Sequence, residues 1–158
     1  MPLANTLTRP YGAFVRFFDF LSPFFDLVIR LWVAKVFFQS GLTKIQSWES
    51  TRMLFEYEYN VPLLPPHIAA YLGTATELGL PVFIALGLMG RLSALVLFVF
   101  NIVAVFSYSE FLFSREGAGG LQQHILWGTM IAMILFHGPG RLSLDYLIKR
   151  RVERNGDG

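Results

Sequence analysis

The chain contains no cysteine. This absence excludes disulfide bonds, thiol redox chemistry and cysteine-ligated metal or iron–sulfur sites within the chain. We also expect no metal site and no covalently attached cofactor, since two histidines without acids or cysteines are a weak metal signal. Recognisable motifs of soluble enzymes are missing too, since we find no phosphate-binding loop, no HExxH and no GxSxG. The sequence therefore gives no direct sign of soluble catalytic chemistry.

Charge is also scarce. Only 15% of the residues are charged, against about 25% in a typical soluble domain. Hydrophobic residues make up 54% of the chain, with 16 Phe and 3 Trp, a composition that suits lipid and its interfaces. No secretory signal pattern is apparent at the start, so we expect the first apolar segment to act as an uncleaved membrane anchor.

Four apolar stretches have the length of a membrane span, which is about 20 residues. They cover residues 24–45, 67–89, 92–112 and 121–137. The pattern predicts an all-α membrane protein with a bundle of four transmembrane helices. We divide it into an N-terminal tail with an interfacial helix (1–23), the transmembrane domain (24–148) and a basic cytoplasmic tail (149–158).

The segment before the first span has its own helical pattern. Residues 10–22 gather four apolar side chains on one face: Phe14, Phe17, Phe18 and Leu21. We expect a helix that lies on the membrane surface and ends at Pro23, after a loose stretch over residues 1–9. The alternative is a plain N-terminal extension of the first span.

The connections between the spans are distinctive. The long loop over residues 46–66 is rich in aromatic side chains that suit the headgroup region, and a short helix is predicted over about 48–58. A tight turn is expected at Gly90-Arg91, and Gly138-Pro139-Gly140 should end the fourth span.

The distribution of Lys and Arg predicts the orientation. With four spans both termini lie on one side, and an excess of basic residues marks the cytoplasmic side. The eight on that side are Arg9, Arg16, Arg91, Arg141, Lys149, Arg150, Arg151 and Arg154, and the three on the other are Lys44, Arg52 and Arg115. We therefore expect a multi-pass protein of the bacterial inner (plasma) membrane with both termini cytoplasmic. Its partners would include membrane lipids, with no nucleic acid.

The first span carries Arg30, Lys35 and Gln39 where an uncharged helix would be expected. A cation at bilayer depth costs roughly 2.5–3.5 kcal/mol, so each should have a partner or a polar cavity. Glu77, in the middle of the second span, and Asn101, in the third, lie at about the depth of Lys35. We predict a buried polar cluster in which Glu77 pairs with Lys35 or Arg30. The cluster could be a structural ion pair or part of a ligand pocket.

Not all of these residues can share one site. Lys35 and Gln39 are four residues apart and share a helix face. Arg30 points elsewhere and lies about 7 Å nearer the cytoplasm, so it could instead extend toward the headgroups.

His124, near the start of the fourth span beside Gln122 and Gln123, is the second candidate. A neutral imidazole can hydrogen-bond a quinone, ligate haem iron or carry a proton, although a purely structural role is also open. His67 could join it from the second span. His137 could not, because it lies about 20 Å away along the same helix.

Several short motifs follow one another along the chain, each occurring once. These are Arg30 early in the first span, Gly41-Leu42-Thr43-Lys44 at its outer end, Glu77, Gly87, Arg91, and the run from Gly138 to Asp145. Together they resemble the DoxX family of small membrane proteins over about residues 24–148. The resemblance implies a four-helix membrane bundle and carries over Arg30, Lys44, Glu77 and Asp145 as motif positions. Lys35 and His124 are not matched to the family motifs, and they are candidates only because of their expected depth and their chemistry.

The DoxX name comes from an association with thiosulfate:quinone oxidoreductase subunits, and some members resemble partners in membrane oxidoreductase complexes linked to oxidative stress. The resemblance implies a membrane subunit of a redox or stress-response system. From the polar cluster we predict a bound quinone or lipid-like ligand, and we expect either a homo-oligomer or other redox subunits as partners. A non-catalytic scaffold and a small proton-coupled transporter are the alternatives, and the sequence leaves open whether the chain is itself an enzyme.

Overall fold

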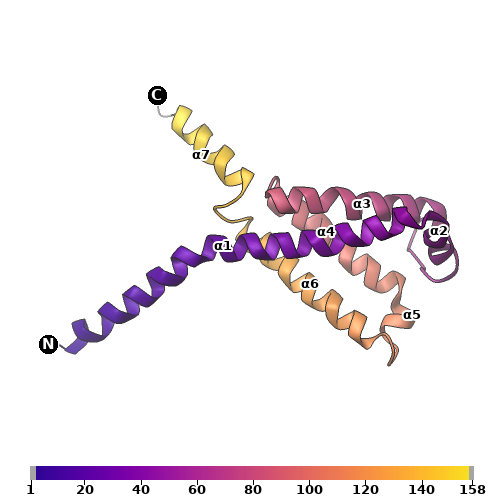
Figure 1. Ribbon diagram of the computed structural model, residues 1–158, viewed down its shortest axis with the longest axis horizontal. Helices are drawn as coiled ribbons and strands as arrows, with labels where there is room; N and C mark the ends of the chain where they lie inside the picture. Colours follow the sequence, from indigo (N-terminus) through magenta and orange to yellow (C-terminus); the bar gives the residue numbers. More distant parts are fainter. Residues whose placement is uncertain (1–2, 157–158) are drawn as a thin grey trace.

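Seven helices make up the computed structural model (Figure 1), which describes the backbone of residues 3–156 and the side chains of residues 11–156. They are α1 (Leu3–Gln46), α2 (Trp48–Tyr57), α3 (Pro66–Leu86), α4 (Gly90–Ser107), α5 (Ser109–Leu112), α6 (Ala118–His137) and α7 (Leu144–Gly156). No strand occurs between residues 3 and 156, so the all-α prediction is confirmed there.

Four helices form the bundle. α1 packs mainly on α3 and α4 mainly on α6, and the two pairs are held together by α3–α4 and α1–α6 contacts. α2 and α5 lie at one end of the bundle, here called the α2 end, and α7 leaves from the opposite or α7 end (Figure 1). The main core joins all four helices through Val33, Ala34, Phe37, Ile84, Ala94, Leu97, Ile131 and Ile134.

The expected break at Pro23 is wrong, because α1 is continuous from Leu3 to Gln46. A proline inside a helix removes one backbone hydrogen bond and crowds the preceding turn, which can kink a helix without ending it. α1 bends before it enters the bundle (Figure 1). Residues from 3 to 9 are therefore helical, while residues 1–2 lie outside the described part.

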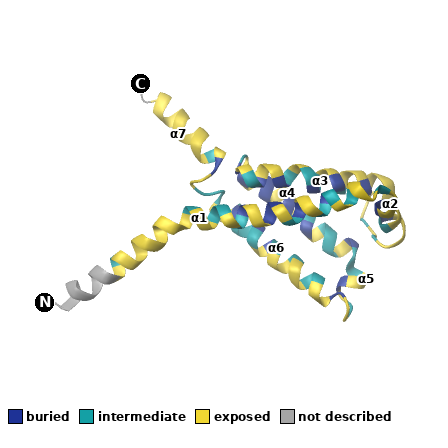
Figure 2. Ribbon diagram, in the orientation of Figure 1, coloured by how far each residue is buried: buried dark blue, intermediate teal, exposed yellow. Residues whose placement is uncertain are grey.

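The half of α1 that precedes the bundle is exposed along the described side chains (Figure 2). Phe14 and Phe17 are 60% and 58% exposed. The aromatic face over residues 10–22 is thus present without a protein partner among the described residues, and its contact with a membrane surface remains a prediction.

Several predicted boundaries shift. The turn after α3 lies at Gly87–Met89, and α4 already begins at Gly90, so the turn expected at Gly90-Arg91 comes earlier. The third predicted span, 92–112, is divided by Tyr108 into α4 and the short α5. The C-terminal segment is one helix from Leu144, so the boundary predicted at residue 149 falls inside α7. The short helix predicted over about 48–58 is confirmed as α2.

In the part of the chain that the structure describes, two helices, α3 and α4, are long and apolar enough to cross a membrane. Their outward faces carry exposed apolar side chains such as Leu72, Phe83, Leu95 and Val99. The start of α1 and the whole of α7 lie beyond the same end of the bundle (Figure 1), as a four-span chain requires. The count of four spans remains a prediction.

Candidate functional site

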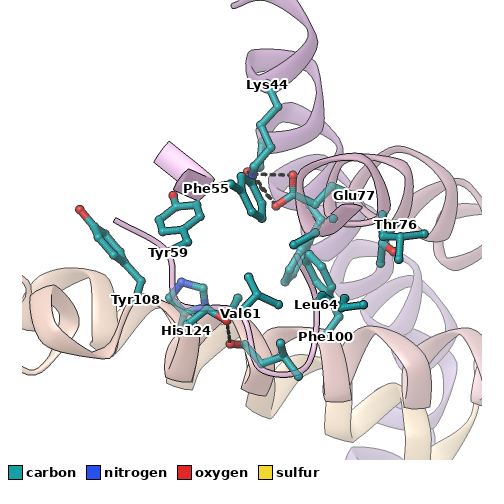
Figure 3. A pocket seen from close by; sticks show the side chains of 18 of the residues that line it. Lys44, Phe55, Tyr59, Val61, Leu64, Thr76, Glu77, Phe100, Tyr108 and His124 are labelled. Carbon is teal, nitrogen blue, oxygen red and sulfur yellow. Dashed lines mark hydrogen bonds and ion pairs between the residues drawn. The ribbon is translucent and has the colours of Figure 1, made fainter. Parts of the chain in front are cut away.

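A cavity of about 340 Å³ opens inside the α2 half of the bundle, between the α1–α3 and α4–α6 pairs (Figure 3). The loop over residues 58–65 and α2 contribute to its walls. Most lining side chains are apolar or aromatic, and the polar ones are few. The lining residues include Val36, Phe37, Ser40, Lys44, Phe55, Tyr59, Val61, Leu64, Thr76, Glu77, Phe100, Ala104, Ser107, Tyr108, His124 and Trp127.

Lys44 and Glu77 form an ion pair on one wall of this cavity. The ammonium nitrogen of Lys44 lies 2.6 Å from Glu77 Oε2 and 2.7 Å from Oε1. The Ser40 hydroxyl donates to Glu77 Oε1 at 3.1 Å and accepts from Lys44 at 3.0 Å. The pairing of Glu77 with Lys35 or Arg30 is therefore wrong, and the cation comes from the family motif instead.

The sequence around Gly41 explains this geometry. Ser40 and Lys44 are four residues apart and so share one face of α1. Gly41 lies between them, where a Cβ atom would come within 2.9 Å of the Leu78 side chain and 3.1 Å of Glu77 Cβ. The missing side chain lets α3 approach closely enough for both polar groups to reach Glu77.

Lys35 and Gln39 do not belong to the polar cluster. Both are exposed and line a shallow groove on the outside of α1 with Phe38 and Thr43. Lys35 precedes Lys44 by nine residues, which places it about half a turn around the helix, on the side away from α3. Lys35 was expected at the depth of Glu77, but its side chain points to the other side of α1.

His124 and Asn101 meet on the α4–α6 side of the cavity. Asn101 is buried, its amide nitrogen donates to the His124 carbonyl at 3.1 Å, and its Oδ1 lies 2.8 Å from His124 Nδ1. The imidazole packs edge-on against Trp127 with ring centres 5.0 Å apart. The predicted neighbours Gln122, Gln123 and His67 are all exposed and do not line the cavity.

An aromatic wall closes the cavity on the third side, and no pattern in the sequence predicts it. Tyr59 packs against Phe55 and Tyr108 with ring centres 5.0 and 4.9 Å apart. Burial raises the pKa of the Tyr59 phenol, and the nearby Tyr108, Glu77 and Glu58 raise it further. The loop that carries Tyr59 is tied to α4, because the Asn60 amide donates to the Ser107 carbonyl at 2.8 Å.

Arg30 lies away from this cavity, at the α7 end. Its side chain is 1% exposed and donates to the Leu142 carbonyl. The guanidinium packs directly on Gly87, which has φ +63° at the end of α3. The helix C-terminus carries a partial negative charge, which favours a cation there. Arg30 therefore holds the 138–143 segment against the α3–α4 turn, and the alternative of an exposed headgroup contact is wrong.

Asp145 completes this contact between segments. Its carboxylate accepts from the backbone amides of Met89 at 2.8 Å and Gly90 at 2.7 Å, which are the first free amides of α4. Its own amide donates to the Gly87 carbonyl at 3.0 Å. A carboxylate at a helix N-terminus satisfies unpaired amides and the helix dipole together. The four motif positions thus form two groups. Lys44 and Glu77 line the cavity, whereas Arg30 and Asp145 join the segment after α6 to the α3–α4 turn, a contact here called the clamp.

No three His, Asp or Glu side chains in the described part of the chain gather in a way that could hold a metal ion. The groups that could contact an organic ligand are the cavity hydroxyls, the His124 ring and the Lys44–Glu77 pair.

The sequence profile of the DoxX family matches residues 25–110, more than half of the chain. The chain belongs to the DoxX family. The profile of a second family, described as TQO small subunit DoxD, matches residues 68–157. An uncharacterized protein of Haemophilus influenzae is 29% identical over 128 residues, which cover 78% of this chain and 83% of the relative. No solved structure matches significantly. This DoxX protein, with two helices fit to cross a bilayer, is a membrane protein.

Proposed function

We propose that this DoxX protein is the integral membrane subunit of a redox system and that its cavity binds a quinone or similar lipid-like headgroup. The main observation that supports this proposal is the cavity. At about 340 Å³ it falls in the range of small-molecule sites, and it combines apolar walls with a few polar atoms on opposite sides. A quinone needs an apolar slot for its ring and a small number of hydrogen-bonding groups at its two oxygens.

The matches to DoxX and to the TQO small subunit DoxD support the redox part of the proposal. The protein would work with other membrane or soluble redox subunits, or with further copies of itself, in the bacterial inner membrane. Both termini would be cytoplasmic, with α7 and the exposed half of α1 at the lipid surface. Any thiol or disulfide chemistry would be supplied by the partner, because this chain holds no cysteine.

Co-purification of quinone tests this proposal. The protein is purified in mild detergent and extracted with organic solvent, and the extract is analysed by chromatography with redox-difference absorbance. Ala104→Phe should exclude the ligand, because Ala104 lines the cavity and the added ring occupies it. Val99→Phe adds the same ring on the exposed face of the same helix and serves as the control.

The proposal expects near-stoichiometric quinone in the unmodified protein and in Val99→Phe, and little in Ala104→Phe. Absence of quinone from all three, with no binding when quinone is added back, would contradict it and favour a scaffold whose Lys44–Glu77 pair is purely structural. Ion or substrate flux in proteoliposomes that is lost in Glu77→Gln would instead favour the transporter.

A further inference from the structure

The hydrogen-bonding capacity of the cavity indicates which redox form of the headgroup it takes, an inference that rests on the proposed function. An oxidised quinone presents only carbonyl acceptors, whereas a hydroquinone presents two hydroxyl donors. The polar atoms of the cavity that are still free to donate or accept therefore decide which form binds better.

The cation on the cavity wall has no free donor. An ammonium group has three N–H bonds. Lys44 directs three hydrogen bonds, to Ser40 Oγ and to both carboxylate oxygens of Glu77. The Ser40 hydroxyl hydrogen is also used, on Glu77 Oε1. Glu77 receives three hydrogen bonds in total, whereas a carboxylate offers about four acceptor positions. This wall can therefore accept but not donate.

The tautomer of His124 follows from its contact with Asn101. The backbone carbonyl of His124 can only accept, so the Asn101 NH₂ group must face it, at 3.1 Å. The carbonyl oxygen of the same amide then faces His124 Nδ1 at 2.8 Å, and Nδ1 must carry the hydrogen. In the neutral ring Nε2 is consequently an acceptor. Asn101 does not line the cavity whereas His124 does, so Nε2 is the nitrogen available to an occupant.

Five hydroxyl groups line the cavity, and three of them already donate: Ser40 to Glu77, Ser107 to the Val103 carbonyl and Tyr108 to Glu58. The hydroxyls of Tyr59 and Thr76 can play either part, because a hydroxyl both donates and accepts. They can adapt to either form of the headgroup. His124 Nε2 and Glu77 cannot, since each offers only a lone pair and can therefore only accept a hydrogen bond. A quinone carbonyl beside His124 Nε2 would place two acceptors against each other.

We infer that the cavity prefers the reduced, hydroxyl-bearing headgroup, with His124 Nε2 as the acceptor of one hydroquinone hydroxyl and Asn101 as the residue that fixes its tautomer. His124 is a specificity-determining residue in this account, and Asn101 is a positioning residue. The same acceptor pattern disfavours the oxidised quinone.

The tautomer can be measured without any ligand. Changing both His67 and His137 to Gln leaves His124 as the sole histidine, and both replaced residues are exposed and outside the cavity. Nitrogen-15 NMR of the remaining ring should show the hydrogen on Nδ1. In Asn101→Leu this preference should weaken. A hydrogen fixed on Nε2 in the Asn101-containing protein would overturn the inference.

Binding provides the second test. The same two-Gln protein is titrated anaerobically with a short-chain benzoquinone and with its hydroquinone, followed by calorimetry. We expect the hydroquinone to bind about tenfold more tightly, and His124→Phe to remove most of that difference. Equal binding, or tighter binding of the quinone, would overturn the inference and leave the proposed function standing. Binding of neither form would overturn both.

Discussion

Lys44 and Glu77 form an ion pair that ties the α2 end of α1 to the middle of α3, with N–O distances of 2.6 and 2.7 Å. Their side chains are only 15% and 9% exposed. Both charges are therefore largely removed from solvent, and each depends on the other and on Ser40 for compensation.

Loss of one partner should be costly. Glu77→Leu and Lys44→Met should each lower the free energy of unfolding by about 3–5 kcal/mol, because each leaves a desolvated charge or its donors unpaired. The double variant should recover much of that loss. Reversible unfolding in mixed detergent measures these effects. Arg52→Gln breaks the exposed Glu49–Arg52 pair and should cost less than about 1 kcal/mol. Single variants no worse than this control would show that the buried pair is not structural.

Gly87 should tolerate no side chain. Gly87→Ala places a Cβ at φ +63° and against the Arg30 guanidinium. The left-handed backbone conformation alone costs an alanine about 1–2 kcal/mol, and displacement of Arg30 adds to this cost. Gly79→Ala on the same helix meets nothing within 4 Å and should be neutral or stabilising by up to about 1 kcal/mol. Equal stability of the two variants would contradict the account of Arg30.

Asp145 should hold α7 to the α3–α4 turn. Asp145→Ala removes both acceptors of the Met89 and Gly90 amides, and we expect a loss of about 0.5–2 kcal/mol. Limited proteolysis should then cut faster within residues 138–143. Glu153→Gln changes a carboxylate on the same helix whose distance to Lys149 is 3.8 Å, and it should leave cleavage unchanged. Unchanged cleavage in Asp145→Ala would show that the clamp is held by other contacts.

The four-span topology can be mapped without background labelling, because the chain has no cysteine. Single cysteines at the exposed positions Ser50, Arg115 and Arg154 should divide into two groups. A membrane-impermeant maleimide should label Ser50→Cys and Arg115→Cys in spheroplasts, and Arg154→Cys only after permeabilisation. Labelling of Arg154→Cys together with the other two would contradict cytoplasmic termini.

Most helices and their order along the chain could be predicted, because the spacing of apolar residues and the length of each apolar run depend only on neighbouring residues. The second and fourth predicted spans match α3 and α6 to within a few residues, and α2 was expected. Pro23 was misread because a proline signals a bend as readily as a stop. The turn at Gly87–Met89 depends on Arg30 and Asp145, which approach from distant parts of the chain.

The cavity was only partly predictable. Glu77, Asn101 and His124 were identified because polar groups are costly at bilayer depth. Lys44 was assigned to the outer face, since a depth argument counts Cα positions and neglects a long side chain that extends back along its helix. Tyr59 could not be foreseen as a cavity residue, because the path of its loop depends on the Asn60–Ser107 hydrogen bond.

Photoaffinity labelling with an azidoquinone tests the central claim most directly. The reagent is activated on the detergent-purified protein and the labelled peptides are identified by mass spectrometry, with and without excess unlabelled quinone. The account predicts competed labels within residues 55–61, 100–108 and 124–127, which border the cavity, and their loss in Ala104→Phe. Labels confined to exposed apolar faces such as residues 14–25, unaffected by competition or by Ala104→Phe, would contradict it.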